Sequence, residues 1–233
     1  MDKLSLTPAV LIIATIALII TGLSIYISRI FLPAKIRQAY RKSITALAAA
    51  VETKDSGTVG HAQRVARLAV NIARRAGVSR LDLERIEYAA LLMDIGKANV
   101  PQAILNKSEP LTPEEWGIIK SHSVLGAQMV RAIPFLAYTG DFIEHHHEYW
   151  DGTGYPAGLA GDSIPLASRI LSISADYDAM VSERPYHPRP LSKVEALYEI
   201  TKGIGSKYDP AVAQIFLDMV WTESSDDEET VAA

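Results

Sequence analysis

The sequence contains no cysteine. A disulfide scaffold, a cysteine-ligated zinc or iron–sulfur centre and a cysteine nucleophile are therefore excluded. Excess positive charge is also missing, because 23 Lys and Arg stand against 27 Asp and Glu. The net charge of −4 argues against binding of a nucleic-acid polymer, which requires a basic face. No convincing alternation of apolar and polar residues predicts a sheet, and we find no internal repeat.

One long hydrophobic run is present near the N-terminus, where no residue from Leu4 to Ser28 is charged. As a helix, residues 8–27 would reach about 30 Å, the thickness of a bilayer core. A cleaved signal peptide is the alternative. The transmembrane helix is favoured because only Lys3 precedes the run and no small-residue cleavage site follows it.

The charges that flank this run predict its orientation. Only one basic residue precedes it, whereas five follow it before the first acidic residue: Arg29, Lys35, Arg37, Arg41 and Lys42. Basic flanks stay in the cytoplasm. We therefore expect a single-pass anchor with the rest of the chain in the cytoplasm. Pro33 is expected to end or kink the helix.

Composition and periodicity divide the chain into four parts. Residues 1–32 form a tail and the transmembrane helix, 33–50 a juxtamembrane helical linker, 51–220 one folded domain, and 221–233 an acidic disordered tail. An apolar stripe in and after the linker either packs on the domain or pairs with a second copy in a homodimer; its members are Ile36, Tyr40, Ile44, Leu47 and Val51.

The sequence of the folded domain predicts helices joined by short loops. Helix-start signals recur along it, namely Ser79 with Asp82, Thr112-Pro113 with Glu115, Ser192 with Glu195, and Asp209-Pro210. Residues 151–165 are rich in Gly and Pro and form a loop. The expected fold class is all-α.

Histidine and aspartate residues on several of these helices suggest a metal site. His61, Asp94, His122 and Asp176 come from separate segments, and residues 145–147 are all histidine. Helical bundles build two-metal sites from such ligands on facing helices. Surface or satisfied core positions remain the alternative on spacing alone.

Two segments carry a family resemblance. Residues 89–97 (AALLMDIGK) resemble the HD motif region of HD-domain phosphohydrolases. Residues 146–156 (HHEYWDGTGYP) are similar to the signature of the HD-GYP branch, and further matches follow in order over about residues 50–220. A lone HD dipeptide is a weak signal, but the long HHE…GYP string is specific.

The resemblance implies an HD-GYP helical bundle with iron or manganese ions that hydrolyses cyclic di-GMP to pGpG or GMP, at the bacterial inner membrane. It implies six metal ligands, with Asp94 as the bridge: His61, Asp94, His122, His146, His147 and Asp176. Asp94 and Lys97 would be catalytic. Phosphate contacts would come from Lys97 and Arg184, and Tyr155 and Pro156 would shape the loop beside the substrate.

The sequence departs from the family pattern at the first position of the HD dyad, which is Met93. A thioether is a poor ligand for iron(II) or manganese. Gly57 also offers no carboxylate for a third ion, so two ions are the most that we expect. Two hypotheses follow. The chain is an active cyclic di-GMP phosphodiesterase, or an inactive module that binds nucleotide or a partner such as a diguanylate cyclase.

Overall fold

The structure is a computed structural model that describes residues 8–55, 59–183 and 189–231, with side chains described as far as Trp221. The chain forms two units, residues 1–43 and residues 44–233. Helices and loops account for the described residues, in which the β-structure is one isolated bridge between Ile204 and Tyr208. The predicted all-α fold class is confirmed.

The N-terminal helical segment consists of α1 (Pro8–Tyr26), the π-turn η1 (Ile27–Phe31) and α2 (Leu32–Glu52). None of the side chains of α1 is buried. Within the described part of the chain, this one segment is long and apolar enough to cross a membrane, with a mean hydropathy of 2.6 over its best window. A membrane anchor and an N-terminal signal sequence share that length and composition.

Pro33 does not end the helix. The amide of Leu32 bonds to the carbonyl of Ile27, five residues earlier, and α2 then continues. A proline lacks the amide hydrogen that an α-helix requires, and a π-turn is one way for a helix to absorb such an interruption.

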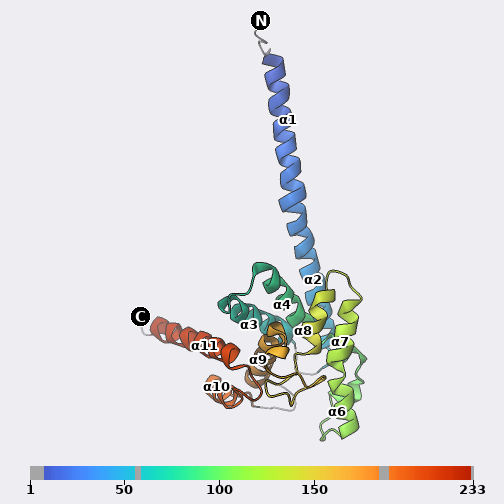
Figure 1. Cartoon of the computed structure of the whole chain (residues 1–233), viewed down its shortest axis with the longest axis vertical. Helices are drawn as coiled ribbons and strands as arrows, with labels where there is room; N and C mark the ends of the chain where they lie inside the picture. The colour runs from blue at the N-terminus through green and yellow to red at the C-terminus, as the bar shows by residue number, and fades with distance from the viewer. Residues whose placement is uncertain (1–7, 56–58, 184–188, 232–233) are drawn as a thin grey trace. The chain divides into compact units, whose positions relative to one another are not determined.

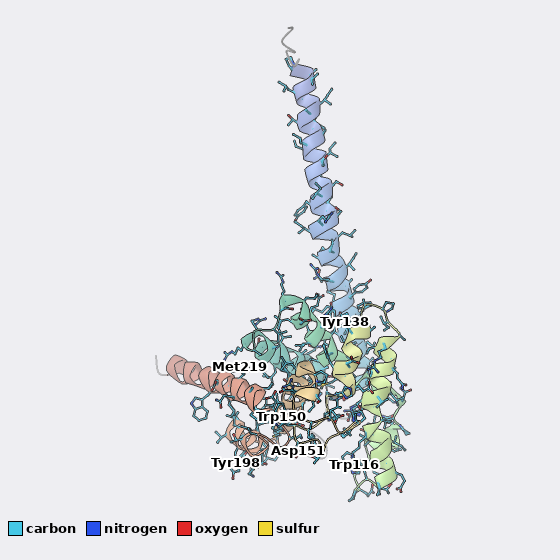
Figure 2. The ribbon with its side chains drawn as sticks, viewed as in Figure 1. Trp116, Tyr138, Trp150, Asp151, Tyr198 and Met219 are labelled. Carbon is cyan, nitrogen blue, oxygen red and sulfur yellow. The ribbon has the colours of Figure 1, made fainter. Side chains whose placement is uncertain are left out.

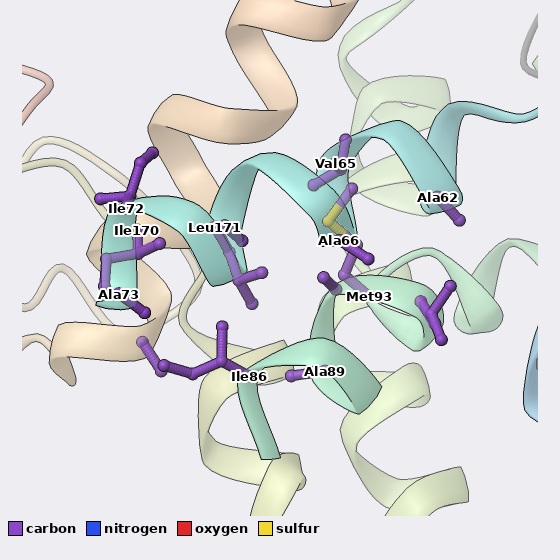
Figure 3. Packing of buried hydrophobic residues seen from close by; sticks show 14 of the residues in the cluster. Ala62, Val65, Ala66, Ile72, Ala73, Ile86, Ala89, Met93, Ile170 and Leu171 are labelled. Atoms are coloured by element: carbon purple, nitrogen blue, oxygen red, sulfur yellow. The ribbon is translucent and has the colours of Figure 1, made fainter. Parts of the chain in front are cut away.

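The core of the second unit lies between α3 (His61–Arg75), α4 (Arg80–Leu92) and α9 (Leu166–Val181), which pack against one another (Figure 1). Most of their apolar side chains are buried in this core, and Figure 3 shows Val65, Ile72, Ala89 and Ile170 among them.

The end of α2 belongs to this core as well. Ile44, Ala48 and Val51 are buried in it at helical spacing. The compact unit therefore begins at Ile44 rather than at the predicted boundary of 51. The apolar stripe packs on the domain through Ile44 and Val51, whereas Leu47 is exposed.

The remaining helices complete the bundle. They are η2 (Ile95–Asn99), α5 (Gln102–Leu105), α6 (Pro113–Lys120), α7 (His122–Arg131), η3 (Ala137–Thr139), α8 (Gly140–Glu144), η4 (Gly161–Ser163), α10 (Lys193–Lys202) and α11 (Pro210–Val231). The predicted starts are confirmed, since Thr112 and Ser192 both form complete capping boxes.

The C-terminal end differs from expectation. The sequence predicts a disordered tail from residue 221, but the backbone of α11 is helical to Val231. No proline or glycine follows Pro210, so residues 211–231 contain neither of the two residue types that most disfavour a helix.

Candidate metal centre

Three histidines from two separate segments meet in the bundle. His122 is the first residue of α7, and His146 and His147 follow the end of α8. One ring nitrogen of each lies within 4.8 Å of those of the other two. The ring centroids of His146 and His147 are 4.0 Å apart, and that of His122 lies 5.4 and 5.1 Å from them.

Two of these imidazoles are oriented by the helix turn that precedes them. The Nδ1 atoms of His122 and His146 each lie 2.6 Å from the carbonyl oxygen three residues earlier, on Ile119 and Ile143. A carbonyl only accepts, so each Nδ1 carries the proton and each Nε2 keeps its lone pair. The Nε2 of His122 is buried and has no hydrogen-bond partner.

Burial keeps the three rings neutral. It lowers the pKa of His146 to about 4, with help from the neighbouring His122 ring. Burial likewise lowers the pKa of His122 and holds that of His147 well below its usual value. Metal ligation requires neutral imidazole, so the histidine cluster is in the protonation state that binds a cation.

Asp94 lies between the histidine cluster and His61. Its Oδ1 is 3.5 Å from Nε2 of His122, and its Oδ2 is 3.9 Å from Nε2 of His61. Burial alone would raise the pKa of Asp94, but nearby positive charge, first of all the Lys97 ammonium, holds the pKa far below its ordinary value. Asp94 is therefore an anion beside the neutral histidine cluster.

His61 is held from the side opposite Asp94. Its Nδ1 lies 2.7 Å from Oδ2 of Asp178, and the guanidinium of Arg64 binds both oxygens of that carboxylate at 2.6 and 3.0 Å. Glu52 accepts from the backbone amides of Gly60 and Ala62, at 2.8 and 2.6 Å, and so fixes the start of α3. A carboxylate behind a histidine sets the tautomer and orientation of the ring.

Lys97 pairs with two carboxylates. Its Nζ donates to Oδ2 of Asp55 at 2.9 Å and to Oδ2 of Asp94 at 3.2 Å. Burial opposes the charge, but Asp94 and Asp55 together raise the pKa of Lys97 above its usual value. The lysine therefore remains a cation beside the site.

Gly96 allows the turn that carries Asp94 to lie against α7. A Cβ at this position would collide with the carbonyl oxygen of His122 and lie 2.7 Å from the amide of Gly126. Any larger residue would separate Asp94 from His122, so the glycine is required by close approach of two backbones.

The predicted loop residues lie beside His147. The Tyr155 ring stacks on the His147 ring with centroids 4.7 Å apart, and Lys120 Nζ lies 5.1 Å from the centroid of the Tyr155 ring. Pro156 follows through a cis peptide bond and is exposed. Tyr155 therefore supports a cluster histidine directly.

Glu148 ties this loop to the histidines. The buried carboxylate accepts from the amides of Ala157 and Leu159, at 2.7 and 3.1 Å. Trp150 and Asp151 lie at the start of the loop (Figure 2). Their amides donate to the carbonyls of Lys207 and Ser206, before α11. Glu148 stands in the HHE string, which is a local signal for its role, and Arg64 stands among the family matches near His61. Glu52 carries no comparable local signal.

Asp176 bonds to residues outside the histidine cluster. Its Oδ2 accepts from the hydroxyl of Tyr208 at 2.9 Å and pairs with Nζ of Lys207 at 2.7 Å. Residues advance about 100° around an α-helix, so positions two apart face nearly opposite sides. Because Asp178 faces His61, Asp176 is turned away from that histidine.

Met93 lies in the hydrophobic core. Its side chain is 2% exposed and belongs to the same apolar cluster as Val65, Ala66 and Ala89 (Figure 3). The predicted phosphate ligand Arg184 and the departure at Gly57 lie outside the described residues. The structure thus brings together His61, Asp94, Lys97, His122, His146 and His147.

The histidine cluster suits a divalent metal ion, and Asp94 lies beside it at His122. Ligands bound at about 2.1 Å to one ion lie no more than about 4.2 Å apart. The separation of 3.5 Å between Asp94 and His122 meets that limit, and the 4.8 Å bound on the histidine nitrogens exceeds it by a few tenths of an ångström. The unpartnered Nε2 of His122 is also accounted for by such an ion.

Known proteins are similar to this chain in sequence. A family model described as HD domain matches residues 45–212. A cyclic di-GMP phosphodiesterase of Thermotoga maritima is 40% identical over 171 residues, which cover 72% of this chain and 46% of that protein. A 3'3'-cGAMP-specific phosphodiesterase of Vibrio cholerae is 38% identical over 157 residues, 67% of this chain and 34% of that protein. The chain spans less than half the length of either relative.

Solved structures agree in fold. A cyclic GMP-AMP-specific phosphodiesterase of V. cholerae superposes with a TM-score of 0.61 at 20% identity, over 77% of this chain and 48% of that chain. An HDGYP protein of Bdellovibrio bacteriovorus gives 0.56 at 23% identity, over 69% of this chain and 51% of that one.

Proposed function

Because the chain belongs to the HD domain family, we propose that it is a metal-dependent phosphodiesterase whose substrate is cyclic di-GMP and whose products are pGpG or GMP. The sequence is related to HD-GYP cyclic di-GMP phosphodiesterases. The observation that carries the proposal is the meeting of three neutral imidazoles, two of them buried and that of His147 half-buried, beside the anionic Asp94.

The metal site consists of His122, His146, His147 and Asp94, and iron or manganese suits these donors. A divalent ion held there would activate water near neutral pH and polarise the phosphodiester. His61 faces the second oxygen of Asp94, with Asp178 and Arg64 fixing its orientation.

Lys97 neutralises charge on the phosphate. An ammonium has three hydrogens, and the two carboxylates Asp55 and Asp94 take two of them. One hydrogen remains for a phosphate oxygen. Because the two carboxylates keep the amine protonated, this donor is fixed in place before the substrate binds.

The N-terminal segment anchors the protein in the bacterial inner membrane, with the HD domain in the cytoplasm. The apolar helix α1 and the five basic residues after it support this topology. The cytoplasm is also where a nucleotide second messenger is available to the site.

A second candidate function is a regulatory module that binds nucleotide or protein without hydrolysis. Two observations favour it. Met93 offers a thioether buried in the core where the family pattern has a histidine, and Asp176 is bonded to Tyr208 and Lys207. Fewer ligands surround Asp94 than the family resemblance implies.

Hydrolysis by the full chain distinguishes the two candidates. The protein is purified in detergent, stripped with a chelator, and reloaded with Mn²⁺ or, without oxygen, with Fe²⁺. Cyclic di-GMP and 3'3'-cGAMP are offered separately, and linear products are measured by chromatography. We expect metal-dependent cleavage of cyclic di-GMP.

The matched variants are Asp94→Ala and Asp162→Ala. The first removes the central carboxylate and should abolish cleavage, whereas Asp162 is an exposed surface residue whose loss should leave activity unchanged. Cyclic di-GMP that binds in calorimetry but is not cleaved under any metal condition would contradict the phosphodiesterase and favour the regulatory module.

A further inference from the structure

The two oxygens of Asp94 face different surroundings. Oδ1 points to Nε2 of His122, at 3.5 Å, and so to the histidine cluster. Oδ2 points to Lys97, at 3.2 Å, and to His61, at 3.9 Å. A carboxylate that bridges two metal ions needs a set of donors around each oxygen. The two halves of this site can therefore be compared donor by donor.

The half of the site around Oδ1 has enough donor atoms to bind one metal ion. It offers the nitrogens of His122, His146 and His147, which lie within 4.8 Å of one another, and Oδ1 of Asp94, which is 3.5 Å from Nε2 of His122. The Nδ1 protons of His122 and His146 are tied to backbone carbonyls, so their Nε2 lone pairs are free for a ligand. Four nitrogen and oxygen donors suffice for a first-row divalent cation.

Among the residues that the structure describes, the Oδ2 half has far fewer free donors. Nε2 of His61 is one, and Oδ2 itself is shared with the ammonium of Lys97. Asp55 is engaged by the same ammonium at 2.9 Å. Met93 packs in the apolar core, and Asp176 bonds to Lys207 and Tyr208.

Lys97 also opposes a second ion by its charge. An ion bound to Oδ2 at about 2.1 Å would lie no more than about 5.3 Å from Nζ, because Nζ is 3.2 Å from that oxygen. Two cations at that separation in a partly buried site repel each other strongly. The lysine already supplies the positive charge that Oδ2 requires.

We infer that this protein binds one divalent metal ion per chain, in the half formed by His122, His146, His147 and Oδ1 of Asp94. His61, whose Nδ1 bonds to Asp178, is then not a metal ligand. This inference rests on the metal requirement of the proposed function, and it specifies the number of ions and which histidines bind.

Metal content tests the inference without reference to activity. The full chain in detergent is loaded with excess Mn²⁺, desalted, and analysed for manganese per chain and by electron paramagnetic resonance. We expect one Mn²⁺ per chain and the six-line spectrum of an isolated ion. His122→Ala should lower the affinity for Mn²⁺ by about tenfold or more, the range found when a metal site loses a supporting group.

His61→Ala is the matched variant and should retain its ion. His61→Gln, which keeps a donor for Asp178, serves if the alanine variant fails to fold, as judged by circular dichroism. Two ions per chain, an exchange-coupled spectrum, or loss of manganese from the His61 variant equal to that from His122→Ala would overturn the inference.

The outcome separates this inference from the proposed function. One bound ion without hydrolysis of cyclic di-GMP supports the inference and contradicts the phosphodiesterase. Two bound ions with hydrolysis contradict the inference and support the phosphodiesterase. A chain that binds no manganese contradicts both.

Discussion

Replacing Met93 by histidine places an imidazole at a buried position next to Asp94. The native side chain is 2% exposed and lies in the apolar core. Without a metal ion, a polar ring at this position loses its hydration, at a cost of about 1–3 kcal/mol. Each kcal/mol lowers Tm by about 2–4 °C in a domain of this size. We therefore expect Met93→His to lower Tm by about 4–8 °C in chelator, for a loss near 2 kcal/mol.

Added metal should reverse this loss. The new imidazole joins Nε2 of His61 and Oδ2 of Asp94, which are 3.9 Å apart, as a third donor in the half of the site that lacks one. Binding at a free concentration of about 100 times Kd stabilises the folded state by about 2.7 kcal/mol. Excess Mn²⁺ should thus restore the Tm, raise the metal content from one ion towards two, and increase hydrolysis of cyclic di-GMP.

The assay is thermal unfolding in chelator and in Mn²⁺, with metal analysis of the same samples. Met93→Leu is the control, because a volume-conserving apolar change costs less than about 1.5 kcal/mol and adds no ligand. Asp94→Ala in the Met93→His background should remove the gain. A variant as stable as wild type in chelator would refute the burial argument. A destabilised variant that gains no ion would refute the reasoning that a third donor completes the Oδ2 half, and would favour the regulatory module.

Four further outcomes are expected. Gly96→Ala should cost about 1–3 kcal/mol of unfolding free energy and weaken metal retention, because its Cβ meets the His122 backbone; an unchanged denaturant midpoint would contradict this. Glu148→Gln should cost about 2 kcal/mol and speed amide exchange at Ala157 and Leu159, which would keep their protection if the carboxylate were dispensable. The fragment 44–233 should be soluble and helical by circular dichroism, since the core is complete within it; a fragment that is recovered only as aggregate would contradict this. A C-terminal reporter should signal from the cytoplasm, and a periplasmic signal would overturn the topology.

Local features of the fold were predictable from the sequence. The capping boxes at Thr112 and Ser192 connect groups three residues apart, so their hydrogen bonds depend on neighbours in the chain. The same holds for the adjacency of His146 and His147. The end of the N-terminal helix was less predictable, because a π-turn absorbs Pro33 where the residue type alone indicates a break.

The sequence by itself determined the all-α class, the long apolar N-terminal helix and the residue types available for a metal centre. Only the tertiary structure decided which of those residues face one another. His61 and Asp178 are 117 positions apart, and their contact fixes the face of α9 that turns Asp176 towards Lys207 and Tyr208. Helix-start signals act over a single turn, whereas the facing of helices depends on how their apolar sides pack in the core. That packing buries Met93 in the core and places the histidine cluster beside Oδ1 of Asp94.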